Sequence, residues 1–508
     1  MNFQSILFKD INEKEVLETA VPAFFPDLNL VQITNSIVSG KDEYNLKPFF
    51  YTSLNNTGSI SYRQEIFKDL ENPALFKHIN SFAENMRTVR QQLVQTDKLY
   101  YKYHRERLFL DIVILYCEAI NSLANHLSMV NLKSQGFLSF REYLTGYVQS
   151  LPFTSLLAEV RNIIAGLSPI KYNIHIKGLR VQVRDYESES DYSAEVEETF
   201  SKFKMGAVKD YSSGFSHPLD MNFVEAKILD GVASLHPGIF LHLDNFCMGN
   251  HNFQDETITV FDREIQFYIA YLDYIAPLRN AGLKFCYPGV SGSKEIYDFE
   301  GFDLALAWKL HREKSSIVTN DFSLKDKERI MVVSGPNQGG KTTFARTFGQ
   351  LHFLAGIGCS VPGREAHLFL YNRLFTHFEK EENIQNLRSK LEDDLVRIYE
   401  ILSQARPDGI IILNEILTST TLQDGIFLSK NIMERIVQLD SLCVWVTFID
   451  ELASYCEKTV SMVGTVIPEN PALRTFKIER KPADGLAYAL SVAEKYRLTY
   501  NLLKERIK

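Results

Sequence analysis

The chain has 508 residues, of which 45% are hydrophobic and 23% are charged, as in an ordinary soluble globular protein. These values exclude a disordered chain, a collagen-like fibre and a small disulfide-stabilised scaffold, and the length predicts about three domains. The formal net charge of −8 excludes a histone-like positive coat. Any contact with nucleic acid must therefore come from a local basic surface.

The six cysteines form no C-x-x-C pair and no Cys/His cluster with zinc-binding spacing. We interpret them as free thiols in a reducing compartment. The N-terminal stretch lacks the basic start of a secretory signal peptide, and no apolar run approaches the ~20 residues of a membrane span. We therefore expect a cytoplasmic protein.

Residues 61–151 predict long packed helices, because apolar residues recur there at helical spacing and no proline falls between Pro73 and Pro152. A further helix is expected over residues 261–283, with its end near Pro277. From about residue 302, short apolar strands alternate with helices. This pattern is typical of an α/β domain with a mostly buried sheet.

A β-hairpin is predicted over residues 170–185, where apolar and polar residues alternate on each side of Gly178. The polar face carries four cations that are candidates for contact with DNA phosphates, namely Lys171, Lys177, Arg180 and Arg184. The alternative is that this face is only the solvated outer side of a two-stranded ribbon.

Residues 335–343 read G-P-N-Q-G-G-K-T-T and match the P-loop (Walker A) motif G-x-x-x-x-G-K-[ST]. An apolar strand precedes them and a helix-forming run follows, which is the context that the motif needs. Backbone N–H groups of such a loop turn toward phosphates, and the helix N-terminus adds partial positive charge. Lys341 is expected to reach the β- and γ-phosphates of ATP, and the Thr342 hydroxyl to bind Mg²⁺.

A second apolar strand, residues 409–415, ends in Asn414 and Glu415. P-loop ATPases usually have Asp-Glu here: the acid holds Mg²⁺ and the glutamate orients the attacking water. An amide at position 414 still accepts a hydrogen bond but neutralises no charge. We predict Glu415 and Lys341 as catalytic residues, and Thr342, Asn414 and Glu415 at the metal. The alternative is a core strand with a polar end.

These motifs resemble those of the MutS mismatch-repair ATPases. The resemblance implies that ATP contacts Gly335, Pro336, Asn337, Gln338, Gly339, Gly340, Lys341, Thr342 and Thr343. Residues 387–395 look like the family's signature segment, in which Ser389 would reach the γ-phosphate bound by the partner subunit. Asp424 would lie across the interface at the nucleotide site. Residues 484–489 resemble the start of the family's C-terminal helices.

The resemblance extends more weakly to residues 25–30 and 62–70, which look like the start of the family's lever domain. It implies a mixed α and α/β fold, in which a helical lever with a small β-rich clamp insertion precedes a P-loop, ABC-like ATPase domain. The expected boundaries are 1–160 for the first part of the lever, 161–255 for the clamp, 256–300 for the returning lever helix and 301–508 for the ATPase domain with C-terminal helices. Because lever-like segments begin the sequence, we expect a short bacterial form without the mismatch-reading and connector domains.

Three positions differ from the family motifs: Asn414 replaces an aspartate, Phe448 a switch histidine and Leu387 the glycine of the signature segment. They predict slow hydrolysis, with ATP binding retained. His352 and His377 are interpreted as core or surface histidines, although Arg373 and His377 could lie near the nucleotide.

The resemblance implies a nucleotide-switched, DNA-binding ATPase that acts as a homodimer in DNA repair or recombination without direct mismatch reading. ATP and Mg²⁺ are the expected cofactors, and branched or duplex DNA is the expected partner. One alternative is a nucleotide-gated dimerisation scaffold with little hydrolysis and no DNA binding, which Asn414, Phe448 and the negative net charge favour. An inactive relic is another.

Overall fold

The computed structural model describes most of the chain. The described residues are 3–10, 12, 17–178, 180–188, 221–379, 390–467, 470–483, 498–500 and 503–504. They form a mixture of helices and sheets, which confirms the expected mixed fold class. The chain divides into two compact units. The smaller unit contains residues 1–3, Leu70–Leu132 and Leu138–Asp262, and the larger contains Gln4–Asp69, Lys133–Phe137 and Arg263–Lys508.

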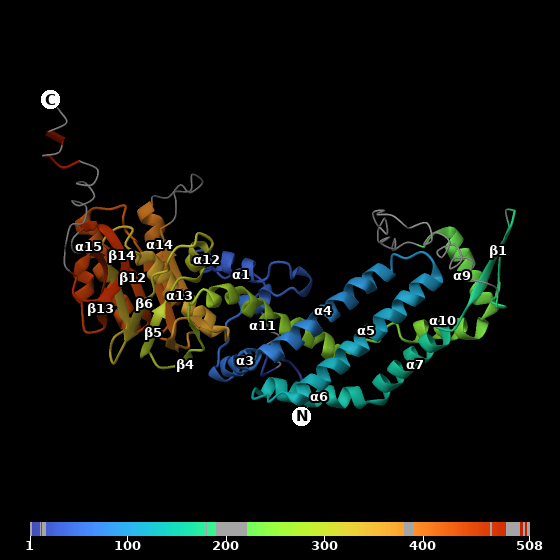
Figure 1. Cartoon of the computed structure of the whole chain (residues 1–508). Coiled ribbons are helices and arrows are strands. Elements are labelled where there is room, and N and C mark those ends of the chain that lie inside the picture. Colours follow the sequence, from blue (N-terminus) through green and yellow to red (C-terminus); the bar gives the residue numbers. More distant parts are fainter. Residues whose placement is uncertain are drawn as a thin grey trace. The chain divides into compact units, whose positions relative to one another are not determined.

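Long helices and one hairpin build the smaller unit, and helices α6 and α11 contribute residues to both units. Helices α4 and α5 run side by side (Figure 1). The elements are α4 (Pro73–Thr96), α5 (Lys102–Met129), α6 (Gln135–Gln149), α7 (Leu151–Leu167), β1 (Tyr172–Lys177), β2 (Arg180–Asp185), α9 (Phe223–Leu235), α10 (Pro237–Gly249) and the first part of α11 (Glu256–Asn280). The start of α4 follows from its sequence, because the Asn72 side chain accepts hydrogen bonds from the backbone of the first turn and Pro73 needs no donor there.

Helix α5 is long and apolar enough to cross a membrane by length and composition alone, which differs from our expectation of no such run. However, 56% of its apolar window is buried in the structure, and it packs against α4, α7 and α10. Its Lys102 pairs with Asp244 of α10. Burial of this kind is typical of the core helix of a helical domain.

The helices of the larger unit surround its sheets. They are α1 (Leu30–Ile37), the 3-10 helix η2 (Asp42–Tyr44), α2 (Lys47–Tyr51), α3 (Thr57–Leu70), the end of α11, α12 (Leu304–Arg312), α13 (Lys341–Gly356), α14 (Lys390–Gln404), α15 (Leu422–Leu439) and the 3-10 helix η3 (Asp450–Ser454). Helix α11 continues past Pro277, where we expected it to end. Pro277 lies in the last turn, so its missing N–H removes only one helical hydrogen bond, and its carbonyl still accepts the Ala281 N–H at 3.1 Å.

A six-stranded sheet forms the centre of the larger unit, in the order β10-β11-β12-β7-β13-β14 (Figure 1). Its strands are parallel except β14, which pairs antiparallel with β13. A four-stranded sheet has the order β4-β9-β5-β6, and β3 pairs with β8. The strands are β3 (Phe285–Cys286), β4 (Gly289–Ser291), β5 (Ile296–Gly301), β6 (Asn320–Leu324), β7 (Ile330–Ser334), β8 (Val361–Pro362), β9 (Glu365–Phe369), β10 (Arg373–Phe378), β11 (Gly409–Asn414), β12 (Leu442–Val446), β13 (Thr459–Ile467) and β14 (Asn470–Arg480).

Both faces of the six-stranded sheet are covered, so β7, β11 and β12 are buried throughout, which explains why they are mostly apolar. One face packs on α14 and α15 through a cluster that includes Trp445, Ile398 and Met433. Helix α13 contacts β11 and β12, and it is buried along most of its length. The end of β7 and the start of α13 therefore meet inside a rigid α/β core.

Candidate nucleotide-binding site

The loop between β7 and α13 has backbone angles that only glycine adopts without strain. Gly335 has φ 115° and Gly340 has φ 95°. A Cβ atom at Gly335 would also lie 2.9 Å from the backbone nitrogen of Gly464 in β13. The loop thus needs glycine both for its left-handed turns and for its close approach to the neighbouring strand.

Lys341 is the first residue of α13, and its side chain turns back into the loop. Its Nζ atom donates to the carbonyl oxygens of Gly335 at 3.1 Å and Pro336 at 3.2 Å, and lies 3.7 Å from Glu415 Oε1. The residue is only 3% exposed. Burial lowers the pKa of its ammonium group, and the nearby carboxylate of Glu415 opposes part of that shift. A buried ammonium at a helix N-terminus among carbonyl groups is suited to bind an anion of high charge.

Strand order brings Asn414 and Glu415 to the same edge of the sheet as the loop, because only β12 separates β11 from β7. The backbone of Glu415 has φ 53° and its N–H donates to Val446 at 2.9 Å. Asn414 is buried, and its side-chain oxygen has no hydrogen-bond partner among the described residues. An unpartnered buried oxygen beside Glu415 is chemically compatible with a hard cation such as Mg²⁺.

Phe448 follows β12 and lies over the lysine. The Lys341 Nζ atom is 4.6 Å from the centroid of the Phe448 ring, and this phenylalanine is 50% exposed. The position at which the resemblance predicted a switch histidine therefore places an aromatic ring against the ammonium group. A ring in this position attracts the cation but transfers no proton.

The other predicted residues of the loop lie beside Lys341 in the chain, and Asp424 lies on a different helix. Thr342 and Thr343 are half-buried in the first turn of α13, and Asn337, Gln338 and Gly339 complete the loop between Pro336 and Gly340. Asp424 is exposed in the first turn of α15, where its side chain accepts a hydrogen bond from Thr421 Oγ1 at 2.7 Å. Ser389, Leu387 and residues 484–489 lie outside the described residues.

Two contacts near this site were not predicted from the sequence, although His377 was named as a residue that could lie near the nucleotide. Arg474 of β14 donates from Nε to the carbonyl of Asn337 at 3.2 Å, which brings the antiparallel edge strand to the loop. His377 of β10 and Asp394 of α14 form a buried pair beside the strand that carries Glu415. No motif indicates these contacts, because they join distant parts of the chain.

The predicted DNA-contacting cations lie in the smaller unit on the hairpin, which has the predicted antiparallel register. Lys177 pairs with Arg180, and Arg184 occupies the same face as both. Lys171 directly precedes β1, and all four cations are exposed. The opposite face is apolar: Val183 packs near Gly231 of α9, whereas Ile176 is 73% exposed.

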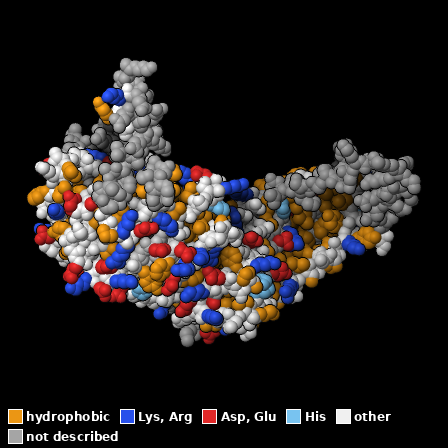
Figure 2. Space-filling model, turned by 60° about the vertical axis from the view of Figure 1, so that its left-hand side comes forward, with side chains coloured by type: hydrophobic (Ala, Val, Ile, Leu, Met, Phe, Trp, Pro, Cys, Tyr) orange, Lys and Arg blue, Asp and Glu red, His pale blue; other side chains and the backbone are white. Residues whose placement is uncertain are grey.

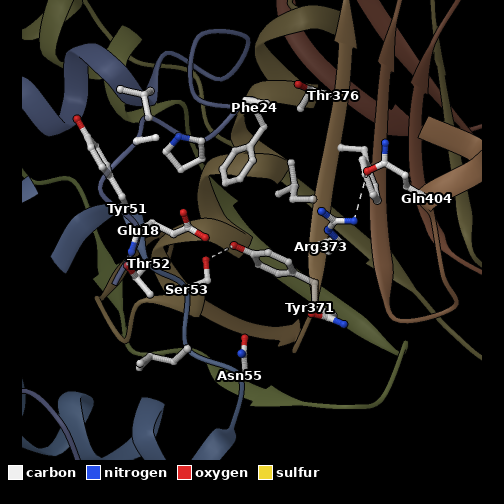
Figure 3. A pocket seen from close by; sticks show the side chains of 18 of the residues that line it. Glu18, Phe24, Tyr51, Thr52, Ser53, Asn55, Tyr371, Arg373, Thr376 and Gln404 are labelled. Carbon is white, nitrogen blue, oxygen red and sulfur yellow. Dashed lines mark hydrogen bonds between the residues drawn. The ribbon is translucent and has the colours of Figure 1, made fainter. Parts of the chain in front are cut away.

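A cavity of about 880 Å³ lies elsewhere in the larger unit, and its lining does not include the loop 335–343 (Figure 3). It lies between the N-terminal segment and the strand β10. Figure 3 shows Ser53 hydrogen-bonded to Tyr371, and Arg373 to Gln404. No residue of the loop 335–343 lines it, so the nucleotide assignment rests on the geometry of the loop and not on this cavity. Arg373 therefore belongs to this cavity.

Acidic and basic side chains are interspersed on the face of the molecule drawn in Figure 2. This mixture agrees with the small negative net charge of the chain. Because no single charge dominates this face, contact with nucleic acid would depend on local groups of cations.

Comparison with known proteins agrees with the geometry of the loop. Residues 331–505 match the family model "MutS domain V". This part of the chain is similar to MutS domain V. The matched range begins within β7 and includes the loop, Asn414, Glu415 and Phe448.

Individual relatives with similar sequence are mismatch-repair proteins. The DNA mismatch repair protein MutS of Orientia tsutsugamushi (strain Boryong) is 26% identical over 214 residues, which are 41% of this chain and 24% of the relative. Msh3 of Mus musculus is 31% identical over 168 residues, covering 32% of this chain and 15% of the relative. MutS of Erythrobacter litoralis is 29% identical over 250 residues, covering 45% and 28%. The chain thus matches less than a third of the length of each of these relatives.

Proposed function

We propose that the protein is an ATP-dependent DNA-binding protein of the MutS type, a nucleotide-switched homodimeric ATPase that acts in the cytoplasm. Its part in DNA repair or recombination would not involve direct mismatch reading. The observation that carries the proposal is the buried ammonium of Lys341, held at the start of α13 within a glycine loop and beside Glu415. The match to MutS domain V supports the same assignment.

In this proposal the loop 335–343 binds the triphosphate through its backbone N–H groups and Lys341. Mg²⁺, when bound, would be held by Thr342, Asn414 and Glu415 and would neutralise phosphate charge. Glu415 would orient the water that attacks the γ-phosphate in line with the leaving group. Lys341 and the N–H groups of the loop would stabilise the charge that develops on the phosphoryl oxygens.

The homodimer supplies the remaining parts of the proposed site. Ser389 would reach the γ-phosphate bound by the other subunit, and Asp424 would lie across the same interface. ATP would then favour the paired state because each nucleotide contacts both subunits. By linkage, pairing would tighten ATP binding by the same factor. Closure would alter the grip on DNA through the lever and the hairpin cations.

A second candidate is a nucleotide-gated dimerisation scaffold with little hydrolysis and no DNA binding. The contact between Phe448 and Lys341 favours it, because the ring occupies the place of a polar switch residue. Asn414 favours it as well, since an amide attracts Mg²⁺ less than a carboxylate does.

Gel-shift experiments separate the two candidates. Plain, mismatched and branched duplexes are titrated at stated salt concentrations, with and without ATP. We expect DNA retardation that weakens as the salt concentration rises. Each phosphate contact contributes up to about one unit to the slope of log K against log salt concentration, so that slope should become shallower when four cations are changed to alanine, namely Lys171, Lys177, Arg180 and Arg184. A variant with Lys327 changed to alanine, an exposed cation of the larger unit, is the control. Absence of retardation at low salt would favour the scaffold.

A further inference from the structure

Asp394 contacts two elements other than its own helix, and one of them is the turn that carries Glu415. It lies in the second turn of α14 and is 7% exposed. One oxygen, Oδ1, lies 2.9 Å from Nε2 of His377 in β10. The other, Oδ2, accepts the backbone N–H of Leu417 at 3.2 Å. A single carboxylate therefore links α14, the edge strand β10 and the turn that follows β11.

The turn that Asp394 holds is the one that carries Glu415. Glu415 has φ 53° and Leu417 has φ 61°, so two side-chain-bearing residues adopt the left-handed region within three positions. Such a backbone is unfavourable for residues other than glycine and persists only when surrounding contacts enforce it. Two hydrogen bonds enforce it here: the Glu415 N–H donates to the Val446 carbonyl, and the Leu417 N–H donates to Asp394.

Asp394 stays ionised although its side chain is buried. Burial favours the neutral acid, but the hydrogen bond and charge of His377, together with the Leu417 N–H, outweigh it and lower the pKa of Asp394. A carboxylate that accepts on both oxygens is a strong acceptor. The Leu417 N–H of the strained turn therefore donates to a charged carboxylate, which is a stronger acceptor than a neutral acid.

A second carboxylate, that of Glu379, also links the start of α14 to the turn 415–418. Glu379, directly after β10, pairs with Lys390 of the first turn of α14. The same carboxylate accepts a hydrogen bond from Thr418 Oγ1 at 3.4 Å. The first turns of α14 therefore contact the turn 415–418 through two acidic residues that lie on different elements.

We infer that Asp394 is a positioning residue: with His377 it fixes the strained turn 415–418 to α14 and so sets the place of Glu415 beside Lys341. This inference rests on the proposed ATPase function for its effect on the reaction. Because α14 begins directly after Ser389, a shift of this helix would be transmitted to Glu415 by the same carboxylate. The pair thus connects the segment proposed to meet the partner with the group proposed to orient water.

Hydrogen exchange measured by mass spectrometry on the full-length protein tests the positioning without requiring turnover. Asp394→Asn keeps the size of the side chain but removes its negative charge and one of its two oxygen acceptors. We expect faster exchange in peptides that cover residues 415–418, with residues 331–345 unchanged. Glu400→Gln, an exposed acid on the same helix, is the matched control and should change neither. Unchanged exchange at 415–418, or faster exchange throughout residues 331–467, would overturn the inference.

Steady-state kinetics and binding of a nonhydrolysable ATP analogue give the second measurement. We expect Asp394→Asn to lower kcat roughly tenfold to a hundredfold, since small misplacements of catalytic groups have effects of this size. Affinity for the analogue should stay within about twofold, because the hydrogen bonds of Asp394 are with His377 and Leu417, which lie outside the loop 335–343. Equal loss of kcat and of analogue binding would indicate general damage and contradict a positioning role.

The failure of the proposed function is distinguishable from the failure of this inference. If the unmodified protein and Lys341→Ala both bind no analogue, the ATPase proposal fails, and the exchange result still decides whether Asp394 holds the turn. If the unmodified protein hydrolyses ATP and Asp394→Asn behaves like Glu400→Gln, only the positioning role fails.

Discussion

The ring of Phe448 lies over the ammonium group of Lys341, with the Nζ atom 4.6 Å from the ring centroid. The same ammonium lies 3.7 Å from a carboxylate oxygen of Glu415. The lysine proposed to meet the phosphates therefore contacts two groups that compete for it. Nucleotide binding in this protein should depend on how strongly these groups hold the lysine.

Replacing Phe448 with alanine should tighten ATP binding. A cation–π contact at an exposed site contributes about 0.5–1 kcal/mol, so its loss should lower the Kd for ATP roughly twofold to fivefold. Isothermal titration calorimetry measures the change. Tyr399→Ala removes an aromatic ring that is 74% exposed on α14 and should leave the Kd unchanged. Weaker binding by Phe448→Ala would show that the ring contacts the nucleotide rather than competing with it.

Asn414→Asp should make hydrolysis faster in the presence of Mg²⁺. A carboxylate attracts the cation more strongly than the buried amide oxygen does, and about 1.4 kcal/mol of extra transition-state stabilisation corresponds to a tenfold rise in kcat. Without metal, the same substitution places a second carboxylate beside Glu415 and should lower the melting temperature by several degrees. Thermal melts with and without Mg²⁺ give the second readout. A variant whose rate and metal dependence equal those of the parent would contradict the assignment of Asn414 to the metal.

Asp298 should make the larger unit less stable as pH rises. Burial, together with the negative charge of Asp321, raises the pKa of Asp298 to about 8. In an unfolded chain an aspartate titrates near pH 4, so the folded state holds an extra proton between these values. The free energy of unfolding therefore falls with pH across this window, by up to about 1.4 kcal/mol per unit, and the contribution is lost above pH 8.

The variant Asp298→Asn removes this titration while keeping the size of the side chain. It should be similar to the parent near pH 4 and clearly more stable at pH 9, as measured by urea unfolding. Glu313→Gln, at an exposed position, serves as the control and should show the pH dependence of the parent. Parallel pH profiles for the parent and Asp298→Asn would contradict this account.

Local motifs explain which parts of the site could be predicted from sequence. The loop at 335–343 carries its own turns in Gly335 and Gly340, and β7 and β11 are apolar because both faces of their sheet are covered. The register of the hairpin follows from its alternation, which repeats with the period of a strand. These features depend on residues that are neighbours in the sequence.

The remaining features depend on contacts that no local pattern encodes. Asp394 meets His377 and Leu417 only after α14, β10 and β11 have packed together, so its place in the segment 387–395 did not indicate these partners. Arg474 reaches the nucleotide loop because β14 pairs with β13. The exposure of Ile176 was not predicted either, since alternation alone does not show whether an apolar face is covered.

Calorimetric titration of the full-length protein with ATP in the presence of Mg²⁺ tests the central claim most directly. The account predicts saturable binding by the parent and binding at least about a hundredfold weaker by Lys341→Ala, since the variant loses the charge-assisted contact to the phosphates. The same titration on Lys327→Ala should match the parent. Equal affinity of the parent and Lys341→Ala, or no heat of binding for the parent, would contradict the assignment of a nucleotide site to this loop.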